Sequence, residues 1–123
     1  MVVENEILKK DDYIYFKVKG VFENIDMNNE LVNYSKIISN CVDEYNCRNV
    51  LLDISKLEYD INSINRYRVG LGIQKLFAKH FVRIACLRNK NVIDDFAEIV
   101  ATNRGAVFKF FNNKKKAIEW LKE

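Results

Sequence analysis

Proline is absent from this chain of 123 residues, and glycine occurs only four times. The sequence also has no internal repeat and no low-complexity segment, so nothing marks a boundary between domains. We therefore expect a single domain that spans residues 1–123. No run approaches the roughly 20 apolar residues that a membrane-spanning helix needs, and the acidic residues 1–6 lack the apolar core of a secretory signal. These absences predict a cytoplasmic protein without a membrane span.

Histidine and cysteine, which often bind metal ions, are also scarce. The single histidine, His80, leaves no multi-histidine metal site. The three cysteines are an odd number without paired spacing, which argues against a disulfide framework and against a zinc site. The sequence has no nucleophile elbow, phosphate-binding loop, dinucleotide fingerprint or zinc-protease motif. We therefore expect no enzymatic activity, no metal and no cofactor.

The residues that are plentiful indicate an ordinary folded domain. Hydrophobic residues make up 49% of the chain and aromatic residues 12%, which is enough for one core. The net charge of +3 is too small to imply nucleic-acid binding by itself, so we expect no nucleic-acid partner.

Short apolar strands alternate with amphipathic helical stretches along the chain. Strands are expected at residues 7–9, 13–19, 48–54, 81–87 and 107–111, and helices at 27–45, 62–79, 91–104 and after Asn112 or Asn113. Asp11 and Asp12 are typical of a hairpin turn between the first two strands. Strands that alternate with helices imply right-handed crossovers. The order β-β-α-β-α-β-α-β-α therefore predicts an α/β domain with a mostly parallel sheet, an antiparallel N-terminal hairpin and helices packed on the sheet.

Apolar spacings of three and four residues mark the expected inward faces of the helices. These faces comprise Leu31, Tyr34, Ile37, Ile38, Cys41 and Tyr45 in the first helix, Ile64, Tyr67, Leu71 and Phe77 in the second, Val92, Phe96, Ile99 and Val100 in the third, and Ala117, Ile118 and Leu121 in the last. Asp26 is expected to cap the first helix, and Gly105 to take the left-handed position after the third. The lysines at 114–116 would crowd positive charge into the first turn of the last helix, either as an anion-binding surface or as solvated residues.

The sharpest change of polarity lies where the apolar run 50–54 ends in Asp53-Ile54-Ser55. A continuously apolar strand is typical of the centre of a parallel sheet, and open α/β sheets bind ligands at the carboxyl ends of such strands. Asp53, Ser55 and Arg66 could therefore form a small polar pocket, with Arg66 binding an anion or a carboxylate. In the structural alternative, Asp53 and Ser55 cap the loop and the next helix, and Arg66 pairs with a nearby carboxylate.

Two stretches in this order and spacing carry a family resemblance. One is Val-Leu-Leu-Asp-Ile-Ser-Lys-Leu at 50–57, and the other is Ala-Thr-Asn-Arg-Gly at 101–105, followed by a strand and by Ala-x-x-Trp-Leu at 117–121. They resemble STAS domains related to the sporulation anti-sigma-factor antagonist, and in particular an uncharacterised bacterial branch described as STAS/CRAL-TRIO-like. The resemblance covers residues 7–122. It implies a non-catalytic regulatory or protein-interaction domain that binds a protein partner or forms a homodimer.

The phosphorylation motif of these antagonists is not reproduced here. In the resemblance, Ile61 takes the place of the motif's aspartate and Asn62 that of the phosphorylated serine, with Ser63 one position away. A kinase-driven switch at this helix is therefore not expected. Ser63 remains a candidate binding residue, together with Asn103 and Arg104 of the Asn-Arg-Gly turn.

The Asn-Arg-Gly turn also has a structural explanation. Gly105 would take a left-handed cap, the Asn103 side chain would bond to the backbone, and Arg104 would interact with the negative end of the helix dipole.

A relation to lipid-transfer folds implies an alternative function, a binder or carrier of a small apolar or anionic ligand. Aromatic residues of the expected helices, Tyr34, Tyr45, Tyr67 and Phe77, would line its pocket, although such residues more often form a plain core. A cavity of roughly several hundred Å³ would favour this alternative.

Overall fold

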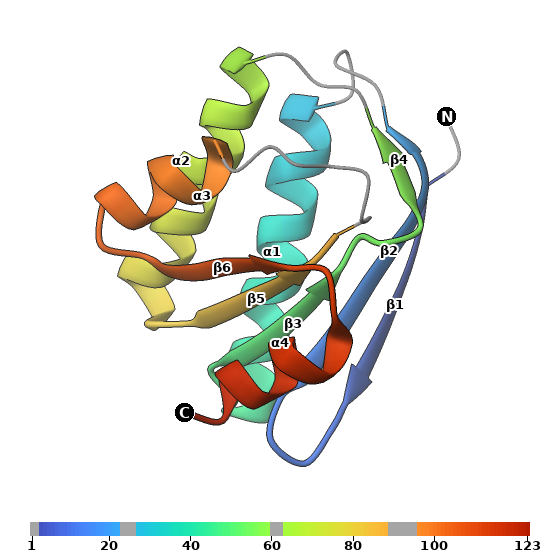
Figure 1. Ribbon diagram of the computed structural model, residues 1–123, viewed down its shortest axis with the longest axis vertical. Coiled ribbons are helices and arrows are strands. Elements are labelled where there is room, and N and C mark those ends of the chain that lie inside the picture. Colours follow the sequence, from blue (N-terminus) through green and yellow to red (C-terminus); the bar gives the residue numbers. More distant parts are fainter. Residues whose placement is uncertain (1–2, 23–26, 60–62, 89–95) are drawn as a thin grey trace.

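The computed structural model describes residues 3–22, 27–59, 63–88 and 96–123 (Figure 1). The strands in these ranges are β1 (Val3–Lys9), β2 (Ile14–Phe22), β3 (Asn49–Asp53), β4 (Leu57–Tyr59), β5 (Arg83–Leu87) and β6 (Val107–Phe111). The helices are α1 (Met27–Tyr45), α2 (Ser63–His80), α3 (Phe96–Asn103) and α4 (Lys114–Leu121). Within the same ranges, none of the helices is both long and apolar enough to cross a membrane.

The six strands form one mixed sheet in the order β1-β2-β3-β5-β6, with β4 beside β2. β1 and β2 are an antiparallel hairpin, whose turn is closed by a hydrogen bond from the Lys10 N–H to the Tyr13 carbonyl (2.9 Å). The pairs β2–β3, β3–β5 and β5–β6 are all parallel. The expected α/β fold, with its antiparallel hairpin and otherwise parallel sheet, is thus confirmed.

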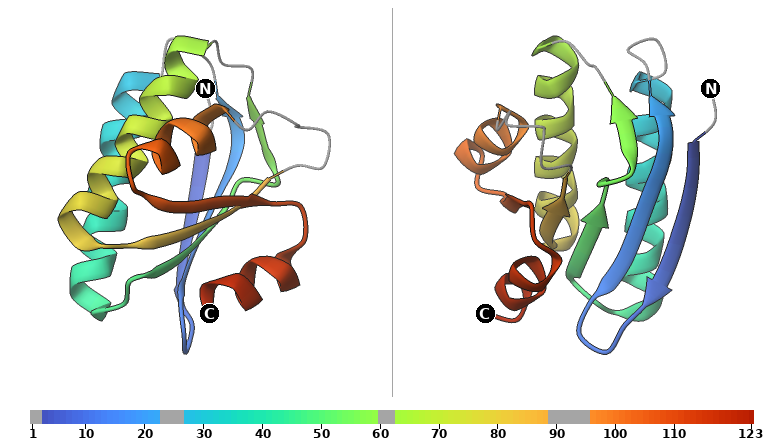
Figure 2. Two further views of the ribbon diagram at one scale, coloured as in Figure 1. Left: turned by 60° about the vertical axis from the view of Figure 1, so that its left-hand side comes forward. Right: turned by 45° about the vertical axis from the view of Figure 1, so that its right-hand side comes forward.

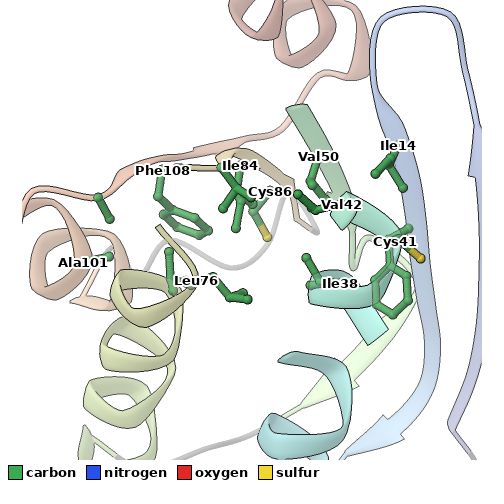
Figure 3. Close-up of a cluster of buried hydrophobic side chains, with 14 of the residues drawn as sticks. Ile14, Ile38, Cys41, Val42, Val50, Leu76, Ile84, Cys86, Ala101 and Phe108 are labelled. Carbon is green, nitrogen blue, oxygen red and sulfur yellow. The ribbon is translucent and has the colours of Figure 1, made fainter. Parts of the chain in front are cut away.

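Helices cover both faces of the sheet, with α4 in front of it and α1 behind in Figure 1. Residues of β2 alternate between the two faces, as the two-residue period of a strand requires. Ile14, Phe16 and Val18 pack into the larger core with α1, α2 and α3, whereas Tyr15 packs into a smaller cluster with α4. Figure 3 shows part of the larger core, where Ile38 and Cys41 of α1 meet the sheet.

The ends of two helices follow the predicted capping. Asn113 caps α4, because its side-chain oxygen accepts a hydrogen bond from the Lys116 N–H (3.1 Å). Gly105 follows α3 with φ of +90°, and the next residue, Ala106, bonds back to the Ala101 carbonyl (3.1 Å). A left-handed residue followed by a hydrogen bond back to the last turn of the helix is the Schellman motif. The expected role of Gly105 is therefore confirmed. Asp26, the expected cap of α1, lies outside the described residues.

The buried face of α2 differs from the expected one. Ile64 and Tyr67 are 64% and 38% exposed. The buried residues of the helix are Asn65, Gly70, Ile73, Leu76 and His80. α2 has apolar residues on two sides, so periodicity alone did not reveal which side α1, α3 and the sheet would cover.

Two further expected inward residues are exposed: Ile99 of α3, at 52%, and Tyr45 at the end of α1. In α3, Val100 and Ala101 are buried. The position of Val92 and the side chains of Leu31 and Phe96 lie outside the described residues.

A short strand that the sequence did not indicate, β4, continues along the same edge of β2 as β3. Ile14 pairs with Val50 in β3, but Gly20 pairs with Leu57 in β4, so the chain gains one extra residue between the two pairings. The sequence predicted that this strand would end before Gly20. Gly20, with φ of +126°, instead lies within β2, which continues to Phe22. Such an insertion is a bulge, and it bends the chain directly after Asp53.

Candidate functional site

The polar residues at the end of β3 are joined in a compact hydrogen-bonded cluster. The Oδ1 atom of Asp53 accepts bonds from the backbone N–H of Ser55 (3.0 Å) and from its hydroxyl (2.6 Å). The Oδ2 atom accepts a bond from the Tyr15 hydroxyl (2.5 Å). Asp53 is only 5% exposed, and both oxygens of its carboxylate accept hydrogen bonds.

The surroundings of Asp53 favour its charged form. Burial by itself raises the pKa of this carboxyl, but hydrogen bonds from Ser55 and Tyr15 and the positive charge of Lys17 outweigh burial and lower it. Burial, together with the bond to Asp53, raises the pKa of the Tyr15 hydroxyl. At neutral pH the pair is therefore a carboxylate and a neutral phenol, with the phenol as donor.

The structure brings Asp53 and Ser55 together but separates them from Arg66. The Asp53 carboxylate points to the face of the sheet that α4 covers, whereas Arg66 lies on α2, which packs on the opposite face. The hydrogen bonds of Asp53 and Ser55 account for both residues as parts of the β3–β4 turn. Ser63 is the first residue of α2, and its side chain lies outside the described residues.

The candidate residues Asn103 and Arg104 lie at the end of α3, next to α2. The Arg104 Nη2 atom donates a hydrogen bond to the Tyr67 hydroxyl (2.9 Å), and its guanidinium lies 5.4 Å from the centre of the Tyr67 ring. Asn103 is exposed. Arg104 therefore connects the Asn-Arg-Gly turn to the exposed side of α2, a contact that the sequence did not reveal.

The exposed side of α2 carries a row of apolar side chains. Ile64, Tyr67 and Leu71 follow one another at spacings of three and four residues, which places them on one stripe of the helix. We call these three residues the α2 stripe. Ile64 and Tyr67 are exposed and Leu71 is half-buried. Contiguous apolar side chains on a surface are typical of a contact site for another molecule.

A serine, a histidine and an aspartate meet between α1 and α2. The Ser39 hydroxyl lies 2.6 Å from Nε2 of His80, and Nδ1 of His80 lies 3.3 Å from the Asp43 carboxylate. Acyl-transfer enzymes use this connectivity, but they also need hydrogen-bond donors for an oxyanion. Ser39 lies in the middle of α1, where backbone N–H groups bond to carbonyls one turn earlier. Through these contacts the cluster links the end of α2 to α1.

No local motif could have revealed this cluster. Ser39 and Asp43 are one helical turn apart, but His80 lies 41 residues from Ser39 and reaches it only through helix packing.

The aromatic residues expected around a ligand are not gathered in one place. Tyr34 packs edge-on against Phe16, and Phe77 against Phe81. A gap between α1 and the sheet, lined by Ile14, Phe16 and Ile38 among others, has essentially no room even for a water molecule. Clefts for small ligands measure roughly 300–1,000 Å³, so this gap does not support the carrier alternative.

The first residue of α4, Lys114, lies over Tyr15, the residue that bonds to Asp53. The Lys114 ammonium lies 4.7 Å from the centre of the Tyr15 ring. This cation–π contact offsets part of the electrostatic cost of a positive charge in the first turn of a helix. Lys115 and Lys116 are exposed.

The arrangement of strands and helices is that of the SpoIIAA-like, or STAS, fold. No protein-family model and no curated protein matches the chain. Among solved structures, an anti-sigma factor antagonist from Mycobacterium paratuberculosis is similar with a TM-score of 0.67, 11% identity, and coverage of 99% of this chain and 96% of that one.

Two further structures support this assignment of the fold. RsbS S58E from Moorella thermoacetica is similar with a TM-score of 0.61, 19% identity, and coverage of 96% of this chain and 94% of that one. An uncharacterised protein with a SpoIIAA-like fold from Shewanella loihica gives a TM-score of 0.55 at 19% identity, with coverage of 97% and 93%. The resemblance to STAS domains is thus confirmed for the fold.

Proposed function

We propose that this chain is a non-catalytic regulatory domain that acts by binding another protein through the α2 stripe. The observation that carries the proposal is the exposure of Ile64 and Tyr67, 64% and 38%, on a helix whose opposite side is buried. A helix that presents apolar residues at i, i+3 and i+7 offers the repeating anchors by which proteins pack on helices. The similarity to an anti-sigma factor antagonist supports a protein as the partner.

The proposal has several narrower parts. The domain spans residues 1–123. It works in the cytoplasm of a bacterium. Its binding does not depend on phosphorylation at the start of α2. Its partner is a different protein, and a second copy of the chain is the alternative occupant of the same stripe. Arg104 belongs to the binding surface, because its bond to Tyr67 fixes the position of that ring. The CRAL-TRIO-like branch and its ligand-carrier function remain predictions without structural support.

Site-specific photo-crosslinking in the cells that produce the protein tests the proposal. A benzophenone amino acid replaces Ile64 in one variant and Leu8 in a matched control, because Leu8 is a similarly exposed apolar residue on β1, which lies at the edge of the sheet away from α2. We expect a cross-linked protein adduct from position 64 and none from position 8. Equal adducts from both positions, or none from position 64, would show that the stripe is not the binding surface.

A further inference from the structure

The charge of α2 is one-sided. The helix contains Arg66, Arg68, Lys75 and Lys79, and it contains no aspartate or glutamate. The overall composition does not require this, because the whole chain has 20 basic and 17 acidic residues. α1 has the opposite bias, with three acidic residues and one lysine. Positive charge is therefore concentrated on the helix that carries the α2 stripe.

Three of these basic residues form a row beside the stripe. Arg68, Lys75 and Lys79 are exposed and are spaced by seven and four residues, so they lie on one side of the helix. Residues four apart on a helix are neighbours, which places Arg68 next to Ile64 and Lys75 next to Leu71. We call Arg68, Lys75 and Lys79 the basic row.

Within its own helix, Arg68 donates a hydrogen bond from Nη1 to Oδ1 of Asn65 (3.2 Å). The neighbouring helix α3, residues 96–103, contains a single acidic residue. Its one carboxylate, Glu98, is directed to the sheet, where Oε1 accepts a hydrogen bond from the Phe110 N–H (3.1 Å). Arg104, which follows α3, adds a further positive charge at Tyr67. The described surface of the two helices thus combines exposed apolar residues with cations along one side.

We infer that the partner of this surface is an acidic amphipathic helix, with apolar residues that pack on the α2 stripe and carboxylates that face the basic row. The inference rests on the proposed function and specifies its partner. Complementary charges at the rim of an interface select the correct partner and accelerate encounter, while apolar contacts at the centre provide most of the affinity. The exposed apolar stripe favours a protein over a nucleic acid, whose recognition relies on phosphate contacts.

Two synthetic helical peptides test the inference with the full chain. Both carry the same leucines at i, i+3 and i+7, and a flanking row of glutamates in one is replaced by lysines in the other. We expect fluorescence anisotropy to detect binding of the glutamate peptide only, with an affinity that falls as salt is added. Lys75→Glu should weaken binding of that peptide roughly tenfold and improve binding of the lysine peptide. Lys10→Glu, at the exposed hairpin turn, is the matched control and should change neither.

The outcomes separate this inference from the proposed function. If both peptides bind equally and Ile64→Asp abolishes both, the stripe is a binding surface but the acidic partner is wrong. If Ile64→Asp changes neither affinity, the proposed surface itself is wrong. Tighter binding of a single-stranded RNA oligonucleotide, lost in Lys75→Glu, would overturn the inference in favour of a nucleic acid. A dimer in sedimentation that Ile64→Asp dissociates would overturn it in favour of a second copy.

Discussion

Replacing Asp53 by alanine should destabilise the domain strongly, although the residue has no catalytic role in this account. The substitution removes the acceptor for the hydroxyl of Tyr15, a residue that is only 8% exposed. It also removes the acceptor for the backbone N–H and the hydroxyl of Ser55. A buried donor left without a partner costs about 1–3 kcal/mol, and a bond to a charged group contributes about 1.5–3 kcal/mol. Because the half-buried Ser55 regains some bonds to water, we expect a loss of about 3 kcal/mol in the free energy of unfolding.

Urea unfolding followed by circular dichroism measures this loss directly. For a domain of this size, about 3 kcal/mol corresponds to a decrease in Tm of roughly 10 °C. Asp11→Ala, at the exposed hairpin turn, is the matched control and should change the free energy of unfolding by less than about 0.5 kcal/mol. Tyr15→Phe should cost about 1–2 kcal/mol, and less in the background of Asp53→Ala, because the two residues share one bond. Equal losses for Asp53→Ala and Asp11→Ala would refute the reasoning.

The same cluster predicts a pH dependence with a definite sign. The pKa of Asp53 is lower in the folded protein than its ordinary value, so the folded state favours the charged carboxylate. Its contribution to stability is therefore fully present above about pH 5, and it is lost as the pH falls through the folded pKa. The difference in unfolding free energy between the wild type and Asp53→Asn should shrink below about pH 4. A difference that is constant down to about pH 2 would contradict the assignment of a charged Asp53.

Three further predictions concern the helices. Gly105→Ala should lower the free energy of unfolding by about 1 kcal/mol, because φ of +90° strains any residue with a Cβ. Gly72→Ala should raise it by about 0.5–1 kcal/mol, because an added Cβ meets no atom within 4 Å. Thermal unfolding measures both variants, and equal shifts in Tm would contradict these two assignments. His80→Ala should cost about 1–3 kcal/mol through loss of its contact with Ser39, as urea unfolding would measure, and an unchanged midpoint would show that the contact is not stabilising. Ile64→Asp should leave the Tm within about 2 °C, because the side chain is exposed; a larger decrease would mean that Ile64 belongs to the core.

Much of the fold could be predicted from the sequence because local patterns and tertiary contacts agree. The bounds of α1, Met27–Tyr45, coincide with the expected helix, since one apolar stripe there has no competitor. The hairpin at residues 11–12 and the caps at Asn113 and Gly105 depend on the conformations of a few adjacent residues. Such features need no knowledge of distant parts of the chain.

The remaining features depend on contacts between distant residues. β4 has three residues and is recognised only by its pairing with β2, beyond the bulge that follows Asp53. The orientation of α2 is set by α1 and α3 rather than by its own pattern, which has apolar residues on two sides. Asp53 and Ser55 were recognised as a polar pair, but the donor from Tyr15 is 38 residues away. The exposed α2 stripe therefore became visible only when the helix was placed on the sheet.

The most direct test of the central claim is the affinity of the partner, identified by crosslinking at position 64 and then purified, for three forms of the chain. Isothermal titration calorimetry would compare the wild type with Ile64→Asp on the α2 stripe and Leu8→Asp on β1. The account predicts that Ile64→Asp weakens binding roughly tenfold or more without a change in Tm, and that Leu8→Asp binds like the wild type. Equal affinities of the wild type and Ile64→Asp would contradict binding through the α2 stripe.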